Sequence, residues 1–328
     1  MNRTKVLVLG GGGFVGRAVV ALLQRTDWAT PVVASRNAKS TNGIETIALD
    51  ARDAESLHAA IKDAGAVINC VTGDGSAIAQ GAQMLVSAAL RGGMPRIVHM
   101  STMSVYGRAE GVVDEGCPLQ DDIGWYGHAK IAAERSMQRY SLDGGQAVIL
   151  RPGCVVGAGS ALWVKRVGIW LEQGRVGDLG IGGDGPANLV SVEDVAQAAV
   201  NALQMPLVAR DVPVFNLVSP ESPRWNDYFA DFALAIGAIP LRTLGARRMK
   251  LDAYALGVPV KVLERVFSKL HLDACLLPTA IPPSLLGLWR QQIRLSHAAA
   301  TKSLCMSWRS YDAMLSDSTQ WFLSTRTT

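Results

Sequence analysis

The sequence predicts an α/β fold built on a doubly wound parallel sheet. Over the first 150 residues, short apolar and β-branched runs alternate with longer stretches of helical periodicity. Strands that are apolar throughout are typical of a parallel sheet covered on both faces. Right-handed crossovers between such strands place the connecting helices on both faces of the sheet. After Pro152 glycine and proline become frequent, which predicts a smaller, mostly helical second part.

Six strands and four helices are expected before Pro152. The strands are expected at Lys5–Leu9, Pro31–Ser35, Glu45–Leu49, Ala66–Val71, Arg96–Ser101 and Ala147–Leu150. The helices are expected at Val15–Gln24, Ala54–Asp63, Ile78–Arg91 and Tyr126–Ser141. Residues 36–43, between the second and third strands, are too few and too polar to predict a helix.

Composition excludes several classes of protein. The chain has 328 residues, of which 49% are hydrophobic and 18% charged, and this balance excludes intrinsic disorder. A net charge of +4 is too small and too scattered to predict a nucleic-acid partner. The histidines lack the spacing of metal ligands, so no metal site is expected.

The expected location is the cytoplasm. The cysteines are widely spread, never form C-x-x-C, and are predicted to be free thiols: Cys70, Cys117, Cys154, Cys275 and Cys305. The chain has no recognisable signal peptide, and no apolar run reaches the roughly 18 residues of a spanning helix. No integral membrane segment is therefore expected.

A glycine cluster follows the first expected strand and opens the first expected helix. Gly10, Gly13 and Gly16 have the spacing G-x-x-G-x-x-G, with Phe14 and Val15 inside it. Such glycines permit a tight turn, close approach of the backbone to a pyrophosphate, and close packing of helix on strand. The helix N-terminus then faces the anion. In this strand–turn–helix context the pattern predicts a dinucleotide-binding Rossmann fold, with all five residues at the cofactor.

The end of the second expected strand bears on the choice between NAD and NADP. An acidic residue there would bind the ribose hydroxyls, but this chain has Ser35 and Arg36. A hydroxyl and a guanidinium suit a phosphomonoester, which favours NADP, with NAD as the alternative. Asp50 and Ala51 follow at the end of the third strand, where the carboxylate of Asp50 can accept from the adenine amino group. Cys70, at the end of the fourth strand, is expected over the adenosine.

Two further polar segments lie at the edge of the sheet where open α/β sheets bind ligands. Ser101 and Thr102 leave the fifth strand, and Tyr126 and Lys130 share one face of the next helix. A lysine cation lowers the pKa of a nearby phenol, and a nicotinamide cation lowers it further. Tyr126 could then exchange protons near neutral pH while Thr102 hydrogen-bonds the substrate oxygen. Y-x-x-x-K alone is common by chance, so the order of all four motifs carries this prediction.

The chain resembles the extended short-chain dehydrogenases/reductases, often described as the NAD-dependent epimerase/dehydratase family. The similarity extends over almost the whole length and includes residues 150–157, 183–185, 192–196 and 298–308, with Trp321. By this resemblance Tyr126 is the acid/base, Lys130 binds the nicotinamide ribose and tunes Tyr126, and Thr102 orients the substrate carbonyl. Ser101 takes that role if the register is displaced by one residue. The segment after the sixth strand contacts the nicotinamide through Pro152, Cys154 and Val155.

The sequence departs from the sugar-nucleotide members of this family at charged positions. Those members carry an arginine that clamps the diphosphate where this chain has Ala187, and an asparagine where it has Gly153 and Cys154. Without these groups a nucleotide diphosphate loses its charge partners. Three arginines of the second part could replace them: Arg242, Arg247 and Arg248. The departures favour a small, fairly apolar substrate.

Three functional interpretations follow. The leading one is an NAD(P)-dependent oxidoreductase that reduces a carbonyl or oxidises the matching alcohol. The alternative is a sugar-nucleotide epimerase or dehydratase that holds NAD tightly and shows no net redox turnover. The third is a non-catalytic dinucleotide-binding scaffold, which the presence of both Tyr126 and Lys130 disfavours.

The motifs also predict two functional parts. Residues 1–152 are expected to form the dinucleotide-binding Rossmann domain, and residues 153–328 the substrate-binding region. Within the latter, about 189–203 should pack back onto the Rossmann core, because Ser191 and Asp194 resemble a capping box that opens a helix at Val192–Leu203.

The sequence leaves the role of one segment and the oligomeric state open. Leu251–Leu295 is apolar, basic and interrupted by prolines, which is consistent with a helical lid or with a surface that takes up lipophilic substrates or touches a membrane. By analogy with the family, a homodimer could form through the helices at 78–91 and 126–141.

Overall fold

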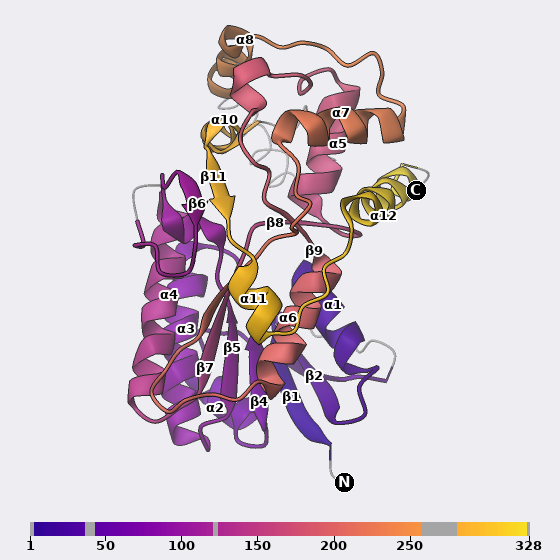
Figure 1. The fold of residues 1–328 in the computed structure, drawn as a ribbon. Helices are drawn as coiled ribbons and strands as arrows, with labels where there is room; N and C mark the ends of the chain where they lie inside the picture. The colour runs from indigo at the N-terminus through magenta and orange to yellow at the C-terminus, as the bar shows by residue number, and fades with distance from the viewer. Residues whose placement is uncertain (1–2, 37–42, 121–123, 257–280, 327–328) are drawn as a thin grey trace. The chain divides into compact units, whose positions relative to one another are not determined.

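A seven-stranded parallel sheet forms the centre of the first of two compact units and confirms the expected doubly wound α/β fold. The computed structural model describes residues 3–36, 43–120, 124–256 and 281–326. The strand order is β10-β7-β5-β4-β1-β2-β3, and every neighbouring pair is parallel (Figure 1). The strands are β1 (Thr4–Leu9), β2 (Ala29–Ser35), β3 (Glu45–Ala48), β4 (Ala66–Asn69), β5 (Arg96–Met100), β7 (Ala147–Pro152) and β10 (Val214–Leu217).

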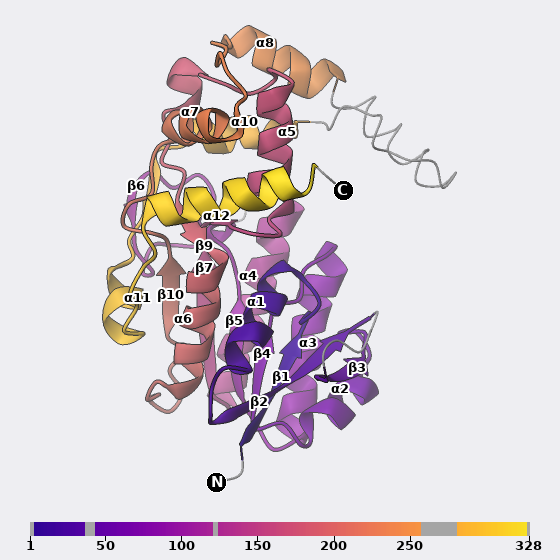
Figure 2. The same ribbon diagram turned by 90° about the vertical axis from the view of Figure 1, so that its right-hand side faces the viewer.

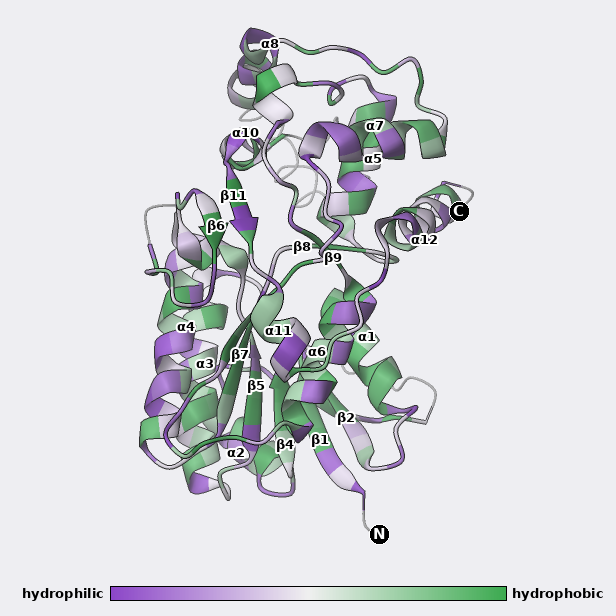
Figure 3. Ribbon diagram, in the orientation of Figure 1, coloured by the Kyte–Doolittle hydropathy of each residue, from purple (hydrophilic) through white to green (hydrophobic). Residues whose placement is uncertain are grey.

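Helices cover both faces of this sheet, as Figures 1 and 2 show. They are α1 (Phe14–Leu23), α2 (Ala54–Ile61), α3 (Gly75–Arg91), α4 (Trp125–Leu142), α6 (Val192–Gln204) and α11 (Ala298–Ser303). Side chains alternate along β1: Val6 and Val8 pack with α1 and α6, whereas Leu7 and Leu9 pack with α2, α3 and α4. Both faces of the inner strands are buried, and most of their residues are apolar (Figure 3).

Several elements begin or end where side chains bind the backbone. The α3 helix starts three residues earlier than expected, because the Asp74 side chain accepts from the Ala77 amide at 2.8 Å and caps it. The β4 strand ends at Asn69, whose side-chain oxygen accepts from the Val71 amide at 3.1 Å and turns the chain. Ser191 caps α6 as expected, accepting from the Asp194 amide at 2.9 Å.

The first unit combines residues 1–155, 190–220 and 295–309. Its seventh strand, β10, was not predicted, because four residues between loops carry too little periodicity. The unit also contains the 3-10 turn η1 (Met103–Tyr106) and the short strand β6 (Gly111–Val113). The short strands β8 (Cys154–Val156) and β9 (Leu189–Ser191) lie where the chain passes from one unit to the other.

The second unit combines residues 156–189, 221–294 and 310–328 around an aromatic core. Its elements are η2 (Ala161–Arg166), α5 (Val167–Glu172), η3 (Gly180–Gly183), α7 (Trp225–Ile236), α8 (Ala246–Leu251), η4 (Asp252–Leu256), α10 (Pro283–Arg290), β11 (Ile293–Leu295, its last residue in the first unit) and α12 (Tyr311–Ser324). Trp225 is fully buried in this core, with its ring centroid 5.7 Å from Phe229 and 6.4 Å from Trp289.

Part of the expected Leu251–Leu295 segment lies outside the described residues. Residues 257–280, which include Pro259, Cys275 and Pro278, form that part; residues 37–42, between β2 and β3, also lie outside the described residues. The lid and surface interpretations therefore stay predictions. Within the described ranges, no helix combines the length and the apolar character that crossing a bilayer requires.

Candidate active site

The glycine loop between β1 and α1 is packed too tightly for a larger residue at two positions. Gly10 has φ +72°, and a Cβ atom there would lie 2.9 Å from the Cys70 carbonyl oxygen. A Cβ atom on Gly16 would lie 2.2 Å from the Gly10 carbonyl oxygen. Gly13 precedes α1 without a side-chain cap, so the amides of the first turn form an anion site. The first two helical residues are Phe14 and Val15. This loop fits the pyrophosphate of a dinucleotide.

The ends of β2 and β3, where the adenosine of the cofactor is expected, carry an exposed arginine and an ion pair that was not predicted. Ser35 ends β2 beside the glycine loop, and the exposed Arg36 follows it. The Asp50 carboxylate accepts from Arg52 Nη2 at 2.8 Å and from Arg52 Nε at 3.1 Å. These bonds, with a smaller contribution from Arg36, lower the pKa of Asp50 to about 2. Asp50 is therefore ionised and bound by Arg52, and the adjacent Ala51 is half-buried.

Cys70 follows β4 and lies near Lys130. Burial raises the pKa of the Cys70 thiol to about 12, although the Lys130 charge opposes this rise. The thiol therefore stays protonated near neutral pH. It can pack against a bound molecule but is not a nucleophile.

The three expected catalytic residues come together between the end of β5 and the first turns of α4. The Thr102 hydroxyl lies close enough to the Tyr126 phenol to lower the pKa of that phenol, and it donates to Ser104 Oγ at 3.3 Å. One helical turn further, Lys130 Nζ donates to the Met100 carbonyl oxygen at 2.6 Å. Lys130 is only 2% exposed, whereas Tyr126 is half-buried. The phenol, the hydroxyl and the amine thus come from two elements that pack directly on each other.

Electrostatics at this site differ from the expectation. We expected Lys130 to make the Tyr126 phenol acidic, but burial raises the pKa of Tyr126, and the nearby Thr102 hydroxyl opposes the rise. Burial also lowers the pKa of Lys130 to about 8. The expectation was wrong because desolvation disfavours the charged form of each group more strongly than its neighbours favour it. Tyr126 is protonated near neutral pH in this state of the protein.

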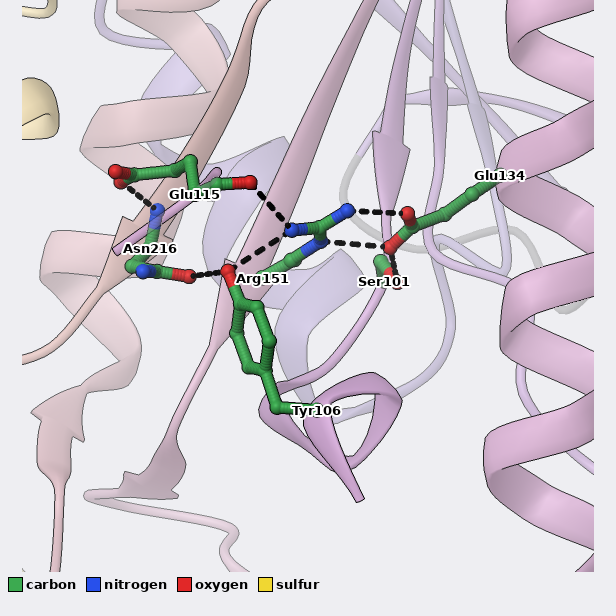
Figure 4. Close-up of polar contacts among 6 residues, drawn as sticks. All are labelled: Ser101, Tyr106, Glu115, Glu134, Arg151 and Asn216. Atoms are coloured by element: carbon green, nitrogen blue, oxygen red, sulfur yellow. Dashed lines mark hydrogen bonds and ion pairs between the residues drawn. The ribbon is translucent and has the colours of Figure 1, made fainter. Parts of the chain in front are cut away.

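Behind this site lies a buried polar network that the sequence did not reveal (Figure 4). Glu134, fully buried on α4, accepts from Arg151 Nη2 at 2.7 Å, from Arg151 Nε at 3.0 Å, and from the Ser101 hydroxyl. Arg151 also donates to the Tyr106 hydroxyl at 2.8 Å. Tyr106 in turn donates to the side-chain oxygen of Asn216 at 2.7 Å. The network therefore ties α4, β5, β7, η1 and β10 together.

Two signals could have identified this network. Glu134 lies four residues after Lys130 and eight after Tyr126, so a carboxylate occupies the same helical face as both. Arg151 is a charged residue in the otherwise apolar strand β7. Charges at positions that should be buried predict pairing, because an unpaired buried charge is costly.

The expected nicotinamide segment follows β7. Pro152 is the last residue of β7 and pairs with Leu217 of β10, and Cys154 and Val155 begin β8. Cys154 is 2% exposed, and burial raises the pKa of its thiol. The contact of these residues with a nicotinamide stays a prediction.

Comparison with known proteins bears on the family. The sequence pattern of the NAD dependent epimerase/dehydratase family matches residues 6–217. Protein YeeZ of Escherichia coli K12 is 30% identical over 161 residues, which are 49% of this chain and 53% of that protein. The chain thus spans about half the length of the curated relatives it matches.

Solved structures share the fold over nearly the whole chain. MoeE5, in complex with UDP-glucose and NAD, has a TM-score of 0.72 at 20% identity, covering 98% of this chain and 99% of its own. UDP-glucose 4-epimerase of Thermotoga maritima has a TM-score of 0.75 at 17% identity, covering 98% and 100%. UDP-glucuronic acid 4-epimerase of Bacillus cereus has a TM-score of 0.74 at 17% identity, covering 98% and 100%. At these identities the likeness shows the fold.

The family pattern covers more than half of the chain, and it spans the glycine loop, the β5–α4 site and all seven strands of the sheet. The resemblance inferred from the motifs is thereby confirmed. The chain belongs to the NAD dependent epimerase/dehydratase family.

Proposed function

We propose that the protein interconverts an alcohol and a carbonyl on its substrate, with Tyr126 as acid/base, Thr102 as substrate-orienting hydroxyl and Lys130 as cofactor-binding amine. The observation that carries this proposal is the closeness of the Tyr126 phenol to the Thr102 hydroxyl, one helical turn from the buried Lys130 amine. A bound nicotinamide supplies the hydride donor or acceptor for such chemistry.

Each side chain has a definite task in this proposal. When a carbonyl is reduced, the Tyr126 phenol, which its raised pKa keeps protonated, donates its proton to the substrate oxygen. In the reverse direction the phenolate accepts the proton of the alcohol, and the Lys130 ammonium favours that phenolate. Thr102 Oγ1 hydrogen-bonds the same substrate oxygen. The loop of Gly10, Gly13 and Gly16 would hold the pyrophosphate.

For the substrate, we propose a sugar nucleotide that undergoes a redox-neutral epimerisation or dehydration. Support comes from the family and from three folds of the same kind: one bound to UDP-glucose and NAD, and two named as 4-epimerases of UDP-sugars. In such a cycle an alcohol is oxidised, the intermediate is rearranged, and the carbonyl is reduced. The same tyrosine then accepts and returns one proton, and no net dinucleotide is consumed.

A second candidate, the net reduction of a small apolar carbonyl compound, is favoured by specific positions. Ala187 is 1% exposed, and a methyl group offers no charge where the sugar-nucleotide members carry an arginine. Arg36 is exposed at the end of β2, where it suits the 2′-phosphate of NADP. NADP dependence is a proposal tied to this second candidate.

One experiment discriminates between the candidates. The purified protein is denatured, any released dinucleotide is identified by mass spectrometry, and native protein is then incubated with UDP-glucose while absorbance at the reduced-nicotinamide band is followed. Retained NAD with sugar conversion and no net absorbance change supports the sugar-nucleotide enzyme. Stoichiometric oxidation of added NADPH by carbonyl compounds supports the reductase. Dinucleotide binding without turnover of either probe contradicts both and leaves a non-catalytic holder.

Arg36→Asp is expected to change the preference between the two dinucleotides. Replacing the cation by an anion removes a charged hydrogen bond to a 2′-phosphate and adds repulsion, so the ratio of NADPH to NADH affinity should fall about tenfold to a hundredfold. Fluorescence titration of each reduced dinucleotide measures this ratio. Arg25→Asp is the matched control, because Arg25 is exposed beyond the other end of α1. A wild type that already prefers NADH would contradict the assignment.

A further inference from the structure

Three side chains of α4, spaced one helical turn apart, meet three consecutive residues at the end of β5. Tyr126 lies close to Thr102, Lys130 donates to the Met100 carbonyl oxygen, and Glu134 accepts from the Ser101 hydroxyl. Tyr126 and Lys130 have roles in the proposed chemistry, whereas Glu134 has none. It is nevertheless fully buried, at the face of α4 that carries both of them.

We propose that Glu134 is a positioning residue of this active site. Through Ser101 it holds the catalytic segment in register with α4, and its negative charge keeps the neighbouring Lys130 protonated. This inference rests on the proposed dinucleotide chemistry, since it assigns Lys130 to the cofactor.

The geometry of Glu134 supports the first task. Its two carboxylate oxygens receive the guanidinium of Arg151 at 2.7 and 3.0 Å, so the side chain has one orientation (Figure 4). The Ser101 hydroxyl binds the same oxygen as Arg151 Nε. Because Thr102 follows Ser101 directly, fixing Ser101 also limits where the Thr102 hydroxyl can meet Tyr126.

Stability of the fold alone does not explain the buried Glu134–Arg151 ion pair. Glu134 and Arg151 are 0% and 3% exposed, and two buried charges lose most of their hydration. A well-packed apolar pair of similar volume is often as stable or more stable. A carboxylate at this position is therefore better explained by what it binds and by the charge it places near Lys130.

The groups that face Lys130 support the second task. Cys70, after β4, is a protonated thiol, because burial raises its pKa to about 12. His99, on β5, is neutral, because burial and the Lys130 charge hold its pKa well below the usual value. Cys70 and, by a smaller amount, Glu134 raise the pKa of Lys130 against desolvation. On α4, Tyr126 is a neutral phenol, so Glu134 supplies the negative charge on this helix. Arg151 partly offsets that charge, so the effect at Lys130 is moderate.

The test measures NADH binding by fluorescence from pH 6 to pH 10. For the wild type, affinity should fall as the pH passes about 8, because the ammonium that attracts the anionic cofactor is lost. For Glu134→Gln the same fall should occur about one pH unit lower, since an opposite charge at close range is missing. Glu134→Asp keeps the charge and should retain the wild-type curve.

Hydrogen exchange of the peptide covering residues 100–106 tests the positioning directly. Exchange should increase in Glu134→Gln, in Glu134→Asp and in Ser101→Ala, because each loses or lengthens the contact between Glu134 and Ser101. Ser101→Ala should leave the pH at which NADH affinity falls unchanged. Tyr140→Phe is the matched control: Tyr140 is buried on α4 and donates to the Pro95 carbonyl oxygen at 2.7 Å, away from the site. Tyr140→Phe should lower the stability of the fold without increasing exchange of residues 100–106 and without shifting the pH at which NADH affinity falls.

Each outcome decides a specific point. A Glu134→Gln curve that coincides with the wild type, or a Glu134→Asp curve that shifts as far, overturns the electrostatic role. Unchanged hydrogen exchange of residues 100–106 in Ser101→Ala overturns the positioning role. Ser101→Ala still tests this role if Glu134→Gln does not fold. Absence of any dinucleotide binding by the wild type instead refutes the proposed function itself.

Discussion

Tyr126→Phe is expected to reduce turnover about a hundredfold to ten-thousandfold, the usual range for loss of a general acid/base. The ring is retained, so packing against Trp125, 5.7 Å away between ring centroids, should persist. What disappears is the hydroxyl that meets Thr102 and would exchange a proton with the substrate. Turnover is measured on whichever probe reaction the wild type supports, UDP-sugar conversion or NADPH oxidation.

Two comparisons make this result interpretable. NADH affinity should stay within about twofold of the wild type, because the glycine loop and Lys130 are untouched, and a twofold change corresponds to a small fraction of the binding free energy. Tyr254→Phe makes the same chemical change at a tyrosine that is 61% exposed in the second unit, and it should leave turnover unaffected. Full activity in Tyr126→Phe would end the assignment of Tyr126 as acid/base.

Arg151→Met is expected to lower the free energy of unfolding by about 3–5 kcal/mol, the usual cost of breaking a buried ion pair from one side. The substitution leaves the Glu134 carboxylate buried with only Ser101 as partner, and it removes the donor to Tyr106. Urea unfolding followed by circular dichroism measures the loss.

The double variant Glu134→Leu with Arg151→Met separates unpaired charge from lost packing. It removes both charges, so it should be more stable than Arg151→Met alone. By the electrostatic argument for Glu134 it should also lose NADH affinity at lower pH than the wild type. Equal stability of the single and double variants would mean that the ion pair contributes little to the free energy of unfolding. The change in packing volume would then account for the loss of stability.

The fold and the glycine loop could be predicted because their signals are local. The apolar strands of the sheet follow from continuous runs of β-branched residues, and the turn at Gly10 requires the positive φ that glycine adopts freely. The approach of Thr102 to Tyr126 could also be anticipated, because both lie where neighbouring elements meet the carboxyl edge of the sheet.

Burial and long-range pairing could not be predicted in the same way. The direction of the Tyr126 pKa depends on how much protein covers the phenol, which no spacing in the sequence reports. The Glu134–Arg151 pair joins residues 17 positions apart through the packing of α4 on β7. The bond between Tyr106 and Asn216 spans 110 positions and involves a strand that had not been anticipated.

The interleaved layout of the two units has a consequence for how the chain is made. The first unit needs residues 190–220, which the ribosome delivers after one segment of the second unit, and residues 295–309, which it delivers after most of the second unit. An emerging nascent chain of 155 residues would lack β10, α6 and α11, and its apolar sheet face would stay uncovered during synthesis. We therefore expect the first unit to mature late in translation, and fragments cut at any single boundary to need chaperone protection.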